Sequence, residues 1–258
     1  MLSIVILMIK SSPHVEKLIE KYKKILSISE EQIIVACNLV DQPNQAALFW
    51  DKSSKTWTIT HNNNVVEFIL VEELGHIYFA KKTKYIRFDF NENDPEIDMS
   101  LYPLLNNLDL CFINYNLTLF DEIYPLYLEM VFEYLDKIDI FKETINRAKD
   151  PILLLSWYIL FFLDFNYLIK KPDREERSNE MSQLISHLKN NLIHCSSVID
   201  DLILNEITDK LKNFDNIKSS SDPEIIIHYI TDLLQATTLW DESTLIKQVK
   251  LYFPKIEH

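Results

Sequence analysis

The sequence predicts an α+β protein that is mainly helical, with a small mixed sheet near its N-terminus. One glycine and nine prolines among 258 residues leave few positions for tight hairpin turns, which argues against an all-β fold. Runs of β-branched and aromatic residues that indicate strands occur only in the first third. After residue 100, every periodic apolar segment has helical spacing. Strands followed by helices are typical of the α+β class.

Four helices are predicted to begin where a capping side chain precedes a proline. Proline suits the first helical position because its missing N–H is not needed there. The expected helices are one from residue 12 to about 26, a short acidic one from 94, a long apolar one from 150, and one from 222 to about 239.

Three or four strands are expected before these later helices. Residues 33–39 are β-branched and apolar. Residues 46–50 and 56–60 flank the polar loop DKSSK, so this segment predicts a β-hairpin. Residues 1–7, MLSIVIL, fit either a further strand or the start of a helix. We therefore expect an α+β part over residues 1–118 and an all-helical part over 119–258, packed as two units or as one continuous unit.

Charge and composition exclude several classes of partner and location. A net charge of −13 argues against a nucleic-acid or anionic-membrane partner. The longest apolar run, residues 151–163, is too short to span a bilayer. The three cysteines form no CxxC pair, which suits a reducing compartment, and the N-terminus has no basic leader. We expect a cytoplasmic protein whose partner is a peptide or protein, with its oligomeric state left open.

Motifs for nucleotide binding and serine hydrolysis are missing. The chain has no Walker loop, dinucleotide-binding glycine fingerprint or GxSxG turn, and one glycine could build none of them. The lone glycine, Gly75, stands instead inside an apolar helical segment, where glycine costs about 1 kcal/mol relative to alanine. A packing or site reason is expected for it.

Two carboxylates and an imidazole share one side of that helix. On a helical wheel, Glu72, Glu73 and His76 fall within a sector of about 100°. Residues 65–82 are apolar nearly all round, so the helix is predicted to be largely buried. Ionised carboxylates are costly there unless a metal ion, a cation or hydrogen bonds compensate.

The sequence EELGH at residues 72–76, called the box below, resembles the HELGH form of the HExxH box of zincin metallopeptidases. Glu72 stands in place of the first histidine. The resemblance implies that Glu72 and His76 ligate a metal ion and that Glu73 is the general base. It also implies that Gly75 lets the box helix pack close to its sheet.

The resemblance covers residues 13–118. Minimal zincins have a helix, a strand and a hairpin before the box, with the last strand along the edge of the cleft. A later helix supplies the third ligand from a segment rich in Asn and Asp, and NNLDLCFINYNLT, residues 106–118, is similar. Asp109 is therefore the candidate third ligand, and residues 1–118 the candidate zincin-like domain.

The replacement of the first histidine of the box by Glu72 changes which metal ion the site would prefer. A set of Glu72, His76 and Asp109 is harder and more anionic than two histidines and a carboxylate. It would hold zinc, or another divalent metal such as manganese or iron, or none. An anionic set also makes a bound water less acidic, which weakens hydrolysis.

Three functions are weighed on this basis. The first is a zincin-like protein with an altered box, inactive or weak as a peptidase, that binds peptide or protein along an edge strand. The second is an active metal-dependent peptidase that uses Glu72, His76 and Asp109, with Glu73 as base. The third is an acidic helical adaptor with no active site.

Other residues that could bind a metal ion also have simple structural explanations. His61 is either a replacement ligand or an ordinary loop histidine. The acidic segment 89–98 lacks the EF-hand spacing and its glycine, so a solvated loop is expected before calcium binding. The triplet of His187, His194 and Cys195 has a metal-like composition, but a helix surface explains it as well.

Overall fold

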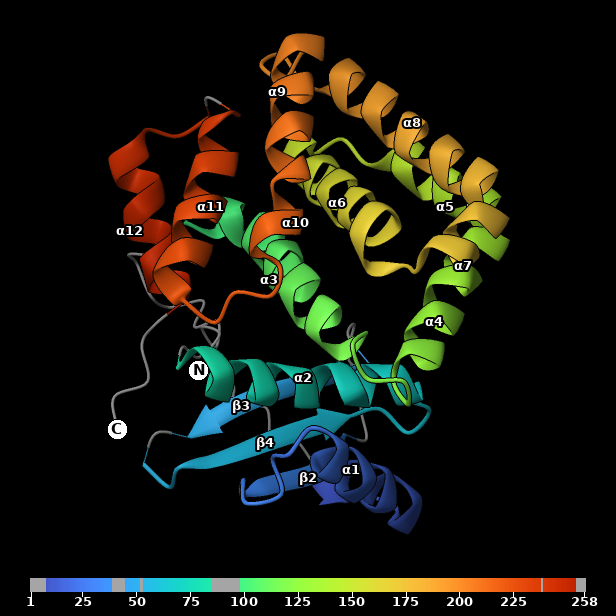
Figure 1. The fold of residues 1–258 in the computed structure, drawn as a ribbon, viewed down its shortest axis with the longest axis vertical. Helices are drawn as coiled ribbons and strands as arrows, with labels where there is room; N and C mark the ends of the chain where they lie inside the picture. Colours follow the sequence, from blue (N-terminus) through green and yellow to red (C-terminus); the bar gives the residue numbers. More distant parts are fainter. Residues whose placement is uncertain (1–7, 39–44, 52, 85–97, 238, 254–258) are drawn as a thin grey trace.

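The computed structural model describes residues 8–38, 45–51, 53–84, 98–237 and 239–253. Within them a small sheet near the N-terminus is followed by helices alone, so the predicted α+β, mainly helical fold class is confirmed (Figure 1). The predicted acidic helix at 94 and the possible strand at 1–7 lie outside these residues.

The sheet is mixed and has four strands in the described part of the chain. Their spatial order is β1-β2-β4-β3. β2 and β4 are parallel, whereas β1 pairs with β2 and β3 pairs with β4 in the antiparallel sense. The bounds are β1 Met8–Lys10, β2 Ile33–Asn38, β3 Ala46–Asp51 and β4 Thr56–His61. The predicted hairpin is therefore confirmed, and β3 is the last strand of the sheet among the described residues.

Two helices cover one face of this sheet. α1 (Pro13–Ile25) packs against α2 (Glu67–Thr83), and α2 also lies along β3. The Tyr22 hydroxyl of α1 donates to Glu67 Oε1 of α2 at 2.5 Å. Trp57 and Ile59 of β4 are buried beneath these helices. On the opposite face of the sheet, Ile34 and Phe49 are 57% and 41% exposed.

The remaining helices build the larger part of the molecule. They are α3 Tyr102–Leu117, α4 Tyr124–Asp136, α5 Ile138–Arg147, α6 Pro151–Leu163, α7 Lys171–Glu176, α8 Ser178–Cys195, α9 Asp201–Lys212, α10 Phe214–Ile217, α11 Pro223–Gln235 and α12 Glu242–Tyr252. α3 packs against both α2 and α6 and so joins the sheet to this part. A single cluster of buried apolar residues extends through both parts.

Helix starts follow the capping pattern expected from the sequence. Ser12 accepts from the N–H of Val15, and Asp150 accepts from that of Ile152. Asp222 caps α11 in the same way. Each side-chain oxygen satisfies an N–H that the first helical turn leaves without a partner.

α6 is the most apolar helix, and it continues into a π-helical turn over Asp164–Leu168. Residues 151–168 form the one helical segment of the described residues that is long and apolar enough to cross a membrane. This segment packs against α3 and α8, and more than half of it is buried. Its hydrophobicity is that of a core helix.

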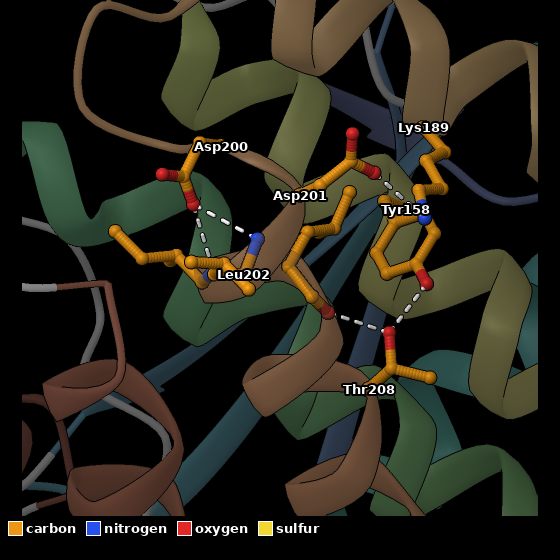
Figure 2. Close-up of polar contacts among 8 residues, drawn as sticks. Tyr158, Lys189, Asp200, Asp201, Leu202 and Thr208 are labelled. Carbon is orange, nitrogen blue, oxygen red and sulfur yellow. Dashed lines mark hydrogen bonds and ion pairs between the residues drawn. The ribbon is translucent and has the colours of Figure 1, made fainter.

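Polar side-chain contacts connect α9 with α6 and α8, as Figure 2 shows. The hydroxyls of Tyr158 on α6 and Thr208 on α9 lie 2.8 Å apart. Lys189 of α8 pairs with Asp201 of α9 at 3.1 Å. Asp200 caps α9 by accepting from the N–H groups of Leu202 and Ile203. These contacts lie far from the box in the sequence and hold the helical part together.

Candidate functional site

The box lies in the middle of α2, and two of its three polar residues are buried. Glu73 and His76 are 8% and 5% exposed, and Glu72 is partly exposed. Apolar residues surround them on most sides of α2, as the sequence predicted. Carboxylates and imidazoles in such a setting need polar partners from neighbouring elements.

Asp109 of α3 is brought to His76. His76 Nδ1 lies 3.5 Å from Asp109 Oδ2, and Asp109 is 2% exposed. Both residues belong to long helices that pack side by side, so the pair is held by rigid elements. The structure therefore joins two of the residues that the zincin resemblance selected.

Gly75 explains how α2 and α3 come so close. A Cβ atom built at Gly75 would lie 2.8 Å from both Ile113 Cγ2 and Leu117 Cδ1 of α3. Carbon atoms make favourable contact near 3.5–4 Å, so a side chain here would force the side chains of Ile113 and Leu117, or the helix that carries them, to shift. The close packing that the sequence predicted for this glycine thus involves α3 rather than the sheet.

The metal-ligand set of Glu72, His76 and Asp109 does not form a three-residue centre. Among the residues that the structure describes, no group of three or more His, Cys, Asp or Glu side chains could hold a metal ion. Structural and catalytic zinc sites use at least three protein ligands. Binding of zinc or another divalent metal at these residues stays a prediction.

A small cavity adjoins the His76–Asp109 pair. It has a volume of about 20 Å³, which is room for one water molecule. His76 and Asp109 line this cavity. The other lining residues are Phe79, Ala80 and Thr83 of α2, Ile113 of α3, and Phe253, which follows α12. The pair thus faces a small, mostly apolar space.

Asp164 is a buried acid near the box that sequence reasoning missed. It is 4% exposed and begins the π-helical turn, a distortion that is frequent at functional sites. Burial raises the pKa of Asp164 to about 7, the Tyr127 hydroxyl lowers it, and the charge of Glu72 raises it. The negative charge of Glu72 therefore affects ionisable groups outside α2, namely Asp164 at the end of α6 and Tyr134 of α4.

Cys111 of α3 lies in the same electrostatic environment. Burial raises the pKa of its thiol well above the ordinary value, and the charges of Asp164, Asp109 and Glu72 raise it further. A thiol held in its neutral form is a poor nucleophile. Cys111 therefore fills space in the core and is not an activated cysteine.

His61 is neither a loop residue nor a partner of the box. It is the last residue of β4, is 2% exposed, and has its Nε2 2.8 Å from the hydroxyl of Ser11. Its Nδ1 lies 2.8 Å from the carbonyl oxygen of Asn62, so Nδ1 donates there and Nε2 accepts from Ser11. His61 ends the second hairpin strand and is buried there, so it is not the loop histidine that was expected. Its contact with Ser11 ties β4 to the segment before α1.

The other sequence candidates lie apart from the box. His187 of α8 contacts Asn191 of the same helix, with 3.3 Å between their side-chain nitrogens. Cys195 Sγ donates to the carbonyl of Ala148 at 3.8 Å. Of the acidic segment 89–98, only Asp98 is described, and it accepts from the indole N–H of Trp240.

Comparisons of the chain with protein-family models, with curated proteins and with solved structures found no match. Function is therefore inferred from the geometry of α2, α3 and β3.

Proposed function

We propose that this chain is a zincin-like protein with an altered box that binds extended peptides along β3 and does not depend on a metal centre. The observation that supports it is the position of β3. β3 is the last strand of the described sheet and lies beside α2, the helix that carries the box. An edge strand next to the box helix is where the family resemblance places a peptide.

The hydrogen-bond pattern of the hairpin identifies the residues that would bind it. The N–H of Asn62 donates to the carbonyl of Gln45 at 2.8 Å, so these two residues form a hydrogen-bonded pair. Such pairs alternate along an antiparallel ladder. In the register Ala46↔His61 to Asp51↔Thr56, the backbone groups of Leu48 and Trp50 therefore point to the outer edge, where a peptide strand would pair with them.

Side chains beside this edge indicate the chemistry of the peptide. Phe49 is 41% exposed on the outer face of the sheet, and Asp51 on the same face is exposed. Hydrogen bonds from Ser54 and Ser53 lower the pKa of Asp51 to about 2, so it is charged at neutral pH. With a net charge of −13 for the whole chain, these features favour a basic peptide with alternating apolar residues.

The same charge disfavours nucleic acid and anionic membrane as partners. The three free cysteines suit a reducing compartment, so we place the protein in the cytoplasm. A second copy of this chain is a poor occupant of the edge, because two molecules of charge −13 repel one another.

Peptide binding is tested with Leu48→Pro. Proline removes the outward N–H and leaves the bonds between β3 and β4 intact, because the N–H of Leu48 points away from β4. The probe is a fluorescein-labelled ten-residue Lys-Val repeat, followed by fluorescence anisotropy. We expect wild type to bind it at least tenfold more tightly than Leu48→Pro does, and more tightly than it binds a Glu-Val repeat.

Leu48→Ala is the matched control, since it shortens the side chain but keeps the N–H, and it should bind like wild type. Circular dichroism confirms that each variant is folded. If wild type binds neither repeat, or if Leu48→Pro binds as well as Leu48→Ala, β3 is not the docking strand.

Metal content separates this function from an active peptidase. His76 and Asp109 lie together, so a metallopeptidase is the second candidate. Mass spectrometry on protein purified without a histidine tag should find wild type essentially free of metal and Glu72→His, which restores the HExxH sequence, enriched in it. Near-stoichiometric metal in wild type that is lost in His76→Ala would contradict the proposal and favour the peptidase.

A further inference from the structure

Ser11 and His61 form a serine–histidine pair away from the box. The Ser11 hydroxyl lies 2.8 Å from His61 Nε2, and His61 Nδ1 lies 2.8 Å from the carbonyl oxygen of Asn62. A carbonyl oxygen only accepts, so Nδ1 carries the proton and Nε2 is the acceptor for the Ser11 hydroxyl. A hydroxyl bonded to a base that a third group orients is the arrangement of an activated nucleophile.

The fold also places a backbone donor beside Ser11. Ser11 lies in the turn between β1 and α1, and His61 is the last residue of β4. Within the described ranges, the N–H of Ser12 makes no hydrogen bond. It stands at the N-terminus of α1, where the helix dipole favours negative charge. The N–H that follows a nucleophilic serine is a common donor to the oxyanion of acyl transfer.

The pair lies just beneath the surface at the start of α1. Ser11 is 4% exposed and His61 is 2% exposed, whereas Ser12, His14 and Asn63 are exposed. A site with so little water strengthens the hydrogen bonds within it. Only a small group fits against a serine with so little open surface, which limits the substrate to a short acyl chain.

We propose that Ser11 and His61 hydrolyse esters of short acyl chains, with Ser11 as the nucleophile and His61 as the general base. Ser11 Oγ bonds to the ester carbonyl carbon and passes its proton to His61 Nε2, and the N–H of Ser12 stabilises the oxyanion. The bond to the alcohol then breaks, and the alcohol leaves with the proton from Nε2. Water attacks the acyl group in the same way, which releases the acid and restores the Ser11 hydroxyl.

Covalent labelling of the full chain with diisopropyl fluorophosphate tests the proposal, because an activated serine oxygen displaces the fluoride. Sequencing of the proteolytic fragment by mass spectrometry locates the label, and the exposed Ser12 is the internal reference. In folded wild type we expect Ser11 to react about a hundredfold faster than Ser12. The excess should vanish in urea above the unfolding transition, since it depends on the folded pair. Equal labelling of the two serines in folded protein, or an excess that persists in urea, would overturn the proposal.

Two variants assign the base. His61→Gln keeps a side chain that can contact Ser11 but takes no proton, so labelling of Ser11 and hydrolysis of p-nitrophenyl acetate should both fall by about a hundredfold. His14→Gln is the matched control, because it removes an exposed histidine close to Ser11 in the sequence, and it should behave like wild type. If His61→Gln, shown to be folded by circular dichroism, labels as fast as His14→Gln, His61 is not the base. If His61→Gln does not fold, the comparison of folded and unfolded wild type decides. None of these results depends on peptide binding at β3, which Leu48→Pro tests by itself.

Discussion

At the scale of single residues, Gly75 has the clearest physical reason for its identity. Any other residue would place a Cβ atom 2.8 Å from Ile113 Cγ2 and Leu117 Cδ1. This close approach lets α3 bring Asp109 to His76. A glycine that weakens its own helix therefore leaves room for two side chains of the facing helix.

Gly75→Ala is expected to destabilise the protein by up to about 2 kcal/mol. Overpacking a core costs about 1–3 kcal/mol, and the better helix propensity of alanine offsets about 1 kcal/mol of that. Urea unfolding measures the net value. In a Leu117→Ala background, which removes two of the three close contacts, the same change should cost at least about 1 kcal/mol less. Equal costs in both backgrounds would show that α3 does not constrain Gly75.

At the scale of elements, local chemistry decided which parts could be predicted. The hairpin strands were predicted to within one residue of β3 and β4, because Asp51 forms the turn by accepting from Ser53 and Ser54. Helix starts were predicted at Ser12, Asp150 and Asp222 for the same reason: each cap bonds its own first turn.

Elements and contacts that depend on distant residues could not be predicted in this way. β1 has three residues and owes its strand conformation to pairing with β2. The Ser11–His61 bond joins residues 50 positions apart. Asp164 ends an apolar run in the sequence, and its burial depends on how α4 and α6 enclose it. Asp109 was selected only through the family resemblance, since nothing local distinguishes it from other helical carboxylates.

At the scale of the whole molecule, Asp164 links stability to pH. Its pKa of about 7 in the folded chain exceeds the ordinary 3.8, so the folded state holds a proton that the unfolded state releases near pH 4. The contribution of Asp164 to the free energy of unfolding therefore falls as pH rises from about 4 to about 7, by up to about 1.4 kcal/mol per unit, and levels off above.

Asp164→Asn removes this proton and should flatten that part of the stability curve. We expect the stability of the variant relative to wild type to increase by up to about 4 kcal/mol between pH 4 and pH 8, measured by urea unfolding at each pH. The difference between the two proteins cancels the contributions of all other carboxylates.

Asp51→Asn is the control, because the lowered pKa of Asp51 places its titration below this range and its curve should parallel that of wild type. A constant difference between Asp164→Asn and wild type from pH 4 to pH 8 would mean that Asp164 is ionised in the folded protein throughout. Hydrogen bonds such as that of the Tyr127 hydroxyl would then have to offset the cost of burying the charge of Asp164.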